Sequence, residues 1–214
     1  MVEDVPGRFA ARVIDAFIDR PDDTFSLAVS GGATARRCYE RLALDGAEAI
    51  DWWAVDLFWS DERCVDHDSE SSNERLVREA LLERIGAANE VHPMRCEEGP
   101  EPYQLKISTL PGIDVVHLGM GPDGHTASLF PGSPALQADA GRLVVMNEDP
   151  SGRNPHRRMT FTFSAIARAR LVLITVEGKD KREAFARVQA GEDLPAARVR
   201  APKVVWLVDP DAAA

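Results

Sequence analysis

The sequence predicts an α/β fold, Rossmann-like and doubly wound, in which a mostly parallel sheet carries helices on both faces. Short runs of β-branched, leucine and aromatic residues recur along the chain, and runs that are apolar throughout suit strands covered on both faces. Segments with helical spacing of apolar residues lie between several of these runs, and this alternation is typical of parallel sheets. With 214 residues, we expect a single domain spanning residues 1–214.

Six apolar segments are predicted to be strands because they are rich in the residue types that favour extended backbone. They are residues 25–29, 55–59, 113–118, 143–146, 171–176 and 204–208. Two stretches fall outside the pattern of strands and helices. We expect a polar loop at residues 97–102 and a frayed tail at residues 209–214.

Four helices are expected from apolar residues that recur on one face. They are residues 5–18, 34–43, 73–85 and 179–189. The third has the clearest ends. Ser71 and Glu74 fit the capping box at its start, and Gly86 suits the position just beyond its end.

Charge and hydropathy narrow the classes of partner. The formal net charge is −10, which disfavours nucleic acid and anionic membranes, because phosphate-backbone affinity comes from accumulated lysine and arginine. The chain lacks the ~18-residue apolar run of a membrane span. Its acidic start is unlike a secretion signal. We therefore expect a cytoplasmic protein, a monomer or weak dimer, that binds a small molecule.

The three cysteines predict neither a disulfide framework nor a zinc site. Cys38, Cys64 and Cys96 are odd in number, far apart and without C-x-x-C spacing. Cys64 follows Arg63 directly and could be a perturbed thiol, but an ordinary small residue of the core or surface is the favoured interpretation. We expect no bound metal.

The stretch from Gly119 to Phe130 carries the strongest chemical signal. Asp123 and His125 stand two residues apart in a glycine-rich turn after a predicted strand, where ligands bind in open α/β sheets. Histidine is the side chain that changes charge near neutral pH. A purely structural turn remains the alternative.

The same stretch also fits the dinucleotide-binding pattern G-x-G-x-x-G through Gly119, Gly121 and Gly124, with Glu148 at a suitable distance for a ribose contact. That motif needs a long helix after its third glycine. Only residues 126–130 can be helical before Pro131. We therefore expect no cofactor.

A candidate anion seat follows the first predicted strand. Gly31 and Gly32 expose backbone N–H groups at the start of a helix, and Ser30 and Thr34 can add hydroxyl donors. The G-K-[ST] ending of a P-loop is absent, so triphosphate hydrolysis is not predicted. An ordinary tight turn is the alternative.

Charged residues follow two further strands, and a third group precedes an apolar stretch. Asp61 and Arg63 come after residues 55–59, and Lys181 comes after residues 171–176. Arginine and lysine suit phosphate, and either Asp61 or Glu62 can serve as an orienting or proton-handling carboxylate. The segment of residues 154–158, which ends at Arg158, is a weaker candidate, and simple solvation is the alternative for all of these residues. The remaining histidines are expected to face solvent or to be structural; they are His67, His92, His117 and His156.

Taken together, these segments resemble 6-phosphogluconolactonases over nearly the whole chain. The matching segments are residues 30–34, 59–63, 72–73, 118–131 and 158–160, Gly178 with Lys181, and residues 194–196. The resemblance implies a Rossmann-like fold and hydrolysis of 6-phosphoglucono-1,5-lactone in the pentose phosphate pathway, without metal or cofactor. It places the general base on His125, with phosphate contacts on the Gly31–Gly32 turn, Arg63 and Lys181.

The chain departs from the family pattern at a few positions. Ala35 stands where proline is common, Arg182 stands where alanine is common, and the segment between His92 and Ile113 is short. The related deaminases carry a glutamate shortly after the histidine, where this chain has residues 128–131, Ser-Leu-Phe-Pro. A sugar-phosphate isomerase or deaminase and a non-catalytic sugar-phosphate sensor are the rival interpretations.

Overall fold

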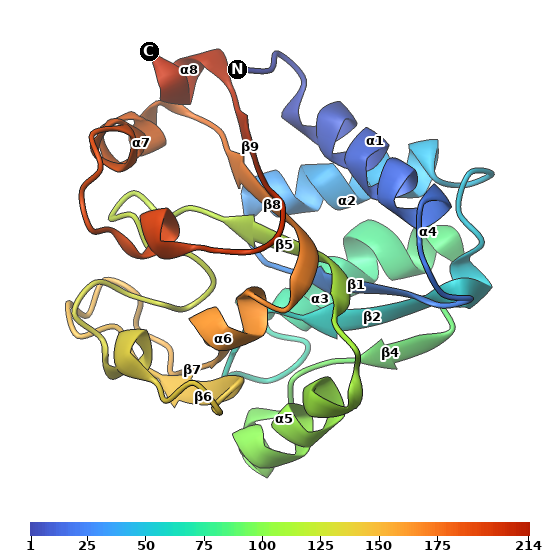
Figure 1. Cartoon of the computed structure of the whole chain (residues 1–214), viewed down its shortest axis with the longest axis horizontal. Coiled ribbons are helices and arrows are strands. Elements are labelled where there is room, and N and C mark those ends of the chain that lie inside the picture. The colour runs from blue at the N-terminus through green and yellow to red at the C-terminus, as the bar shows by residue number, and fades with distance from the viewer.

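The computed structural model describes residues 1–214 and confirms the predicted α/β fold. Its main sheet is parallel throughout (Figure 1). In spatial order its strands are β4 (Glu90–His92), β2 (Val55–Trp59), β1 (Phe25–Val29), β5 (Ile113–Gly119), β8 (Ala169–Val176) and β9 (Val204–Val208). The chain runs outward from β1 to β2 on one side and from β5 to β8 and β9 on the other, so the direction of winding reverses between β1 and β5.

A second sheet of three short strands lies apart from the main one. It pairs β3 (Asp61–Arg63) with β7 (Arg158–Phe161), and β7 with β6 (Val144–Asn147), all antiparallel. The predicted strand at residues 143–146 therefore exists but belongs to this sheet and not to the parallel layer. Arg63 lies opposite Arg158 in the β3–β7 register, so this sheet brings two of the predicted cations together.

Helices cover the main sheet. They are α1 (Val5–Ile18), α2 (Ala33–Asp45), α3 (Asn73–Val77), α4 (Glu83–Ile85), α5 (Pro100–Thr109), α6 (Phe163–Ile166), α7 (Arg182–Gln189) and α8 (Pro210–Ala213). Single turns of 3₁₀ helix occupy Trp52–Ala54, Cys96–Glu98, Pro134–Gln137, Lys179–Lys181 and Pro195–Arg198, and Arg78–Leu82 is a π-helical turn. Helices α1 and α2 pack side by side, whereas α5 and α6 contact the small sheet (Figure 1). None of the helices has both the length and the apolar character that crossing a membrane requires.

The predicted helix at residues 73–85 is interrupted and begins differently from expectation. The π-helical turn separates α3 from α4. The capping residue is Ser72 rather than Ser71: Ser72 Oγ accepts from the Arg75 N–H at 3.2 Å. The Glu74 side chain pairs with Arg95 instead of closing a capping box. Gly86 ends the helix with a positive φ of 83°, as predicted.

Two segments that were expected to be irregular are helical. The predicted loop at residues 97–102 contains a 3₁₀ turn and the start of α5, which Pro100 opens at a position that needs no N–H donor. The tail does not fray. Asp209 caps α8 by accepting from the Ala212 N–H at 2.8 Å, and Ala212 is buried. Both ends of the chain meet there, since the Val2 N–H donates to the Val208 carbonyl at 2.9 Å.

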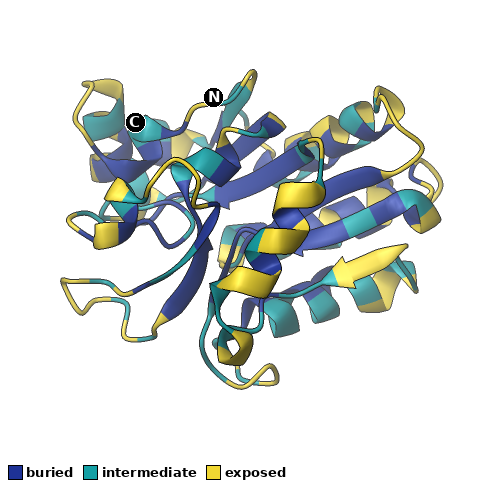
Figure 2. Cartoon of the chain, turned by 60° about the horizontal axis from the view of Figure 1, so that its bottom comes forward, coloured by how far each residue is buried: buried dark blue, intermediate teal, exposed yellow.

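One cluster of 52 buried apolar residues runs through the sheet and the helices that cover it. Figure 2 shows most of the main sheet in the buried colour, whereas the edge strand β4 is largely exposed, as are the outer helix faces and loops. Most residues of strands β1 and β5 are apolar, and their few polar residues are held by hydrogen bonds to neighbouring elements. One of these contacts involves His117.

His117 on β5 is completely buried and belongs to a hydrogen-bonded chain. Its Nδ1 lies 2.8 Å from the Tyr39 hydroxyl and its Nε2 lies 2.9 Å from Thr175 Oγ1. The Tyr39 oxygen in turn accepts from the Ser30 N–H at 2.6 Å. His117 is thus structural, one of the two roles expected for it. This series of hydrogen bonds anchors Ser30, the first residue of the turn that follows β1.

We expect His117 to make the protein less stable in mild acid. Burial lowers the pKa of His117 from 6.5 to about 3. Between pH 6.5 and 3, His117 therefore binds a proton in the unfolded chain but not in the folded protein. The stability that the neutral ring contributes is complete above pH 6.5 and is lost as the pH falls towards 3. Between pH 7.5 and 5.0 the loss from this residue is about 2 kcal/mol.

Urea unfolding at the two pH values measures this effect. A His117→Gln variant starts less stable at pH 7.5, because the polar chain is altered, but it lacks the titrating ring. Its additional loss between pH 7.5 and 5.0 should be smaller than that of the wild type by about 2 kcal/mol. An identical pH dependence in the two proteins would assign the acid sensitivity to other groups.

Candidate active site

Most of the predicted functional residues meet in one pocket at the carboxyl ends of the strands of the main sheet. The pocket lies where the winding direction reverses, between the turns that follow β1 and β5, and ligands of open α/β sheets bind at this point. Its volume is about 280 Å³. The small sheet supplies part of the lining through β3 and β7.

The structure brings most of the predicted site residues into this pocket. Eight of them line it: Ser30, Gly31, Gly32, Asp61, Arg63, His125, Arg158 and Lys181. Thr34 does not line it; its hydroxyl lies 3.4 Å from the Arg37 guanidinium. Asp123 also lies outside the lining, behind His125.

His125 and Asp123 form a close pair. The Asp123 carboxylate oxygen Oδ1 lies 2.5 Å from His125 Nδ1 and also accepts from the His125 N–H at 3.1 Å. Burial alone raises the pKa of Asp123, but the hydrogen bond and charge of His125 and the backbone donors outweigh it, so the pKa lies below its usual value. Asp123 is therefore an acceptor, Nδ1 carries the proton, and Nε2 is the basic nitrogen.

The imidazole is confined on two further sides. The Phe130 ring lies edge-on to it, with 5.0 Å between ring centroids. A Cβ atom at Gly121 would fall 2.1 Å from His125 Cε1, so only glycine leaves room for the ring in this position. The short helix considered for residues 126–130 does not form; this segment is a turn closed by the Thr126–Leu129 bridge.

The two arginines of the small sheet have no carboxylate partner. The Arg63 guanidinium donates from Nη1 to the Ser71 carbonyl at 2.6 Å, and its Nε is buried without an acceptor. Arg158 is buried and donates from Nε to the His156 carbonyl at 3.1 Å. Burial and then the charge of Arg63 lower the pKa of Arg158. The negative charge of an anion bound between these residues would counteract both effects on this pKa.

The acidic neighbours of these arginines are engaged elsewhere. Asp61 Oδ2 accepts from Ser128 Oγ at 2.7 Å. The Glu62 carboxylate accepts from the N–H groups of Asn73 and Glu74 at 2.8 and 2.7 Å, at the start of α3. Burial raises the pKa of Glu62, and the backbone donors partly offset this rise. The carboxylates therefore hold the wall of the pocket in place and leave the guanidinium groups free for a ligand.

The turn after β1 has two features of an anion seat. Gly32 begins α2 without a side-chain cap, so the first N–H groups of this helix are open to a ligand. Gly31 packs directly against Asn73: a Cβ atom at position 31 would lie 1.8 Å from Asn73 Oδ1. Asn73 is itself held by Asp61, whose carbonyl accepts from Asn73 Nδ2 at 2.9 Å.

Three polar lining residues had no role assigned from the sequence. They are Asn73, Ser128 and Asn154. Asn73 and Ser128 lie within the segments that resemble the family, and this resemblance is the feature of the sequence that could have identified them. Asn154 lies on the loop before β7, where Asp149 Oδ2 accepts from its Nδ2 at 2.8 Å.

Ala127, which precedes Ser128 in the chain, also lines the pocket. Its φ of 46° is the only positive value at a non-glycine residue, and such backbone strain clusters at functional sites.

The prediction that the cysteines form no disulfide is wrong. Cys64, at the end of β3, is bonded to Cys96, with 5.4 Å between their Cα atoms, while Cys38 is free and buried. The bridge spans a sequence separation of 32, and closing a loop of this length stabilises the fold by roughly 3–4 kcal/mol in the chain-entropy model. The loop contains Asn73, so the bridge encloses part of the pocket wall.

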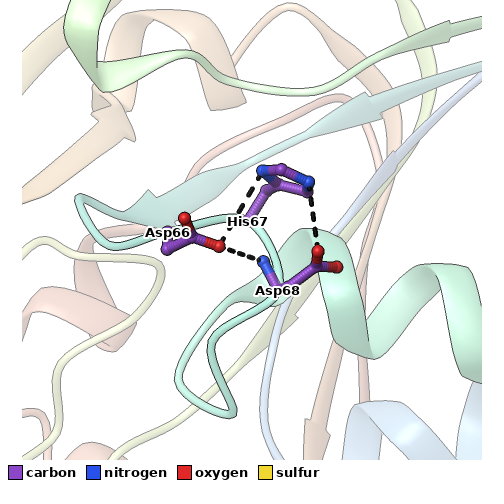
Figure 3. A group of neighbouring side chains, drawn as sticks. All are labelled: Asp66, His67 and Asp68. Atoms are coloured by element: carbon purple, nitrogen blue, oxygen red, sulfur yellow. Dashed lines mark hydrogen bonds and ion pairs between the residues drawn. The ribbon is translucent and has the colours of Figure 1, made fainter.

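A cluster of possible metal-ligating groups lies on the same loop. The side chains of Asp66, His67 and Asp68 approach one another within 4.8 Å and are all exposed (Figure 3). His67 Nε2 lies 3.3 Å from Asp68 Oδ2, and the Asp68 N–H donates to Asp66 Oδ1 at 2.9 Å. These are local contacts along a surface turn, and we assign the cluster no function.

Known proteins are similar to this chain in both sequence and architecture. A 6-phosphogluconolactonase from Synechocystis sp. is 35% identical over 220 residues, covering 94% of this chain and 88% of its own length. Another from Nostoc sp. is 36% identical and covers 100% and 97% of the two chains. The crystal structure of 6-phosphogluconolactonase from Thermotoga maritima superposes with a TM-score of 0.83 at 32% identity, covering 97% of each chain.

The family pattern extends over nearly all of the elements described above. The model of the family described as glucosamine-6-phosphate isomerases/6-phosphogluconolactonase matches residues 1–206, which include every residue of the pocket. The match therefore covers the glycine-rich turns and the small sheet as well as the parallel core. On this evidence the chain belongs to the glucosamine-6-phosphate isomerase/6-phosphogluconolactonase family.

Proposed function

We propose that the protein is a lactonase that hydrolyses 6-phospho-D-glucono-1,5-lactone to 6-phospho-D-gluconate, a step of the oxidative pentose phosphate pathway. The observation that carries the proposal is one pocket in which His125, paired with Asp123 behind it, lies together with two arginines that lack carboxylate partners. A phosphorylated substrate supplies the missing anion, and a lactone supplies a carbonyl that activated water can attack. The Nostoc sp. relative and the Thermotoga maritima structure, each matched over 97% of its own length, are named 6-phosphogluconolactonase.

The phosphate group is the anchor of the substrate in this proposal. It accepts from the N–H groups near Gly31 and Gly32 at the start of α2, and from the side chains of Ser30, Arg63, Arg158 and Lys181. Charge-assisted hydrogen bonds of this kind are stronger than neutral ones. Thr34, which was expected to contribute, is not part of this set because it lies outside the pocket lining.

His125 acts as the general base. Its Nε2 accepts a proton from water while the water oxygen attacks the lactone carbonyl, and Asp123 steadies the imidazolium that forms. Nearby backbone amides or a cation stabilise the oxyanion. As the ring C–O bond breaks, the imidazolium returns the proton to the leaving ring oxygen. Asp61 has an orienting role, because its carboxylate already accepts from Ser128 Oγ.

Incubation with freshly generated 6-phosphogluconolactone tests this function. The protein should accelerate acid release beyond the spontaneous rate, which a no-enzyme control measures. Glucosamine 6-phosphate serves as the second substrate, and release of ammonia from it would favour a deaminase. Binding of either compound without turnover would favour a sensor. Acid release at the control rate would exclude the lactonase.

Lys181 tests the assignment of the phosphate contacts. Lys181→Ala should raise KM about tenfold with little change in kcat, because a charge-assisted hydrogen bond is worth about 1.5 kcal/mol and the phosphate is held equally in ground and transition states. Lys179→Ala is the matched control, since Lys179 is exposed on the same 3₁₀ turn and does not line the pocket. Equal KM values for both variants and the wild type would remove Lys181 from the phosphate site.

A further inference from the structure

The Cys64–Cys96 bridge lies beside the proposed phosphate site, and both of its cysteines are partly exposed. A cleft of about 460 Å³ is lined by both Arg63 and Cys96. Both bonded cysteines are half-buried, unlike Cys38 in the core. Thiol–disulfide exchange requires a thiolate to reach a sulfur atom of the disulfide. The bridge is therefore placed for exchange with a reagent that enters this cleft.

The bridge restrains two parts of the chain that hold Arg63 in place. Cys64 directly follows Arg63, and its N–H extends the β3–β7 pairing by donating to the Arg157 carbonyl at 2.9 Å. The carbonyl that accepts from the Arg63 guanidinium belongs to Ser71, which lies inside the loop closed by the bridge. The covalent bond thus restrains both the backbone that carries this guanidinium and the loop that orients it.

Other contacts keep this region folded when the bridge is open. Arg95, next to Cys96, forms an ion pair with Glu74. The Glu74 N–H donates to Glu62 at 2.7 Å, which links α3 to β3 without the cysteines. We therefore expect loss of the bridge to loosen Arg63 without unfolding the small sheet or the core.

We propose that Cys64–Cys96 is a reversible modification site whose reactant is a dithiol reductant, and that its redox state sets how tightly the pocket holds a phosphate group through Arg63. One thiolate of the dithiol attacks a cysteine sulfur and releases the other cysteine as a thiolate. The second thiolate of the reagent then displaces the first cysteine and closes the reagent's own disulfide. Two electrons pass to the protein, and both cysteines end as thiols.

The proposal rests on the function proposed above, because Arg63 is taken to contact the substrate phosphate, and the cysteines are positioning residues that act through it. Holding one long side chain in place is worth a factor of about two to ten in affinity. The dissociation constant for inorganic phosphate and the KM for the lactone should both rise by this factor on reduction, while kcat changes less.

The experiment compares oxidised protein with protein treated with a dithiol and then freed of it. Thiol titration of the folded protein should find no reactive cysteine before treatment and the two bridge cysteines after it, because Cys38 is buried and burial raises the pKa of its thiol. Calorimetry then gives the dissociation constant for inorganic phosphate in each state, and steady-state kinetics give KM and kcat. Far-UV circular dichroism checks that both states are folded.

Two variants separate the bridge from other effects of the reagent. Cys96→Ser should show the phosphate affinity and KM of the reduced wild type and should not respond to the dithiol. Cys38→Ser should respond like the wild type.

Three results would overturn the inference: a bridge that resists the dithiol in the folded protein, a reduced protein that unfolds, or a reduced protein with unchanged phosphate affinity and KM. A phosphate affinity that responds to the dithiol in a protein without lactonase activity would uphold the modification site and reject the proposed function. Lactonase activity with a KM that is insensitive to reduction would uphold the proposed function and reject the modification site.

Discussion

Replacement of His125 by alanine should lower kcat for lactone hydrolysis by about 10²–10⁴-fold, the usual contribution of a general base. KM should change little, because the proposed phosphate contacts involve other residues of the pocket. The fold should persist, since His125 is only partly buried and its side-chain partner Asp123 lies in the same turn. Initial rates of acid release, corrected for spontaneous hydrolysis, give both constants.

His67→Ala is the matched control for this variant. His67 lies on an exposed turn outside the pocket, and its side chain pairs with the neighbouring Asp66 and Asp68. This variant should retain the wild-type kcat. A His125→Ala enzyme with full turnover would remove the proposed base and leave a pocket that binds phosphate without a group to activate water.

Replacement of Gly121 by alanine should lower kcat by on the order of 10²-fold, since a displacement of about 1 Å at a reacting group can cost that much. The new Cβ atom would lie 2.1 Å from His125 Cε1, 2.2 Å from Nδ1 and 2.7 Å from Asp123 Oδ1. The imidazole must therefore move, and its bond to Asp123 must lengthen or break. Because a side chain yields rather than the backbone, the loss of stability should be small.

Gly141→Ala controls for the glycine-to-alanine change itself, because no atom lies within 4 Å of a Cβ atom at position 141. This variant should match the wild type in both kcat and unfolding midpoint. For Gly121→Ala, wild-type affinity for inorganic phosphate together with low kcat would locate the defect at His125. Wild-type kcat would show that the position of the imidazole is less critical than proposed.

The parallel core was largely predictable because its strands are apolar without interruption. The predicted bounds of β1, β2 and β9 equal those observed, and the bounds of β5 and β8 differ only at their ends. Such runs have one stable location, between two layers of helices. The helices α1 and α2 were likewise visible from the apolar stripe that each turns towards the sheet.

Strand β3 of the small sheet and helix α5 were not predictable in this way. Strand β3 consists of Asp61, Glu62 and Arg63, a charge run that is extended only because β7, about a hundred positions later in the chain, pairs with it. Helix α5 has little separation of apolar and polar faces, since only Tyr103 and Ile107 are buried. In both cases long-range contacts decide the structure, and local sequence carries little record of them.

The candidate site was predictable residue by residue but not as a set of contacts. Glycines, charges and His125 at the ends of predicted strands indicated a shared edge, and the pocket contains most of them. The contact of Ser128 with Asp61 and the Cys64–Cys96 bond join segments that are distant in sequence. Neither has a spacing rule, and an odd number of cysteines argued against any bond.

The packing of Gly31 against Asn73 means that positions 31 and 73 cannot vary independently. A methyl group at position 31 has no space until the carboxamide at position 73 is shortened, and shortening it also removes the donor to the Asp61 carbonyl. Redesign of the turn for a bulkier acidic substrate must therefore begin with α3 and a replacement donor for β3. Homologous chains should show correlated exchanges at these two positions, with small residues at one whenever the other gains a side chain.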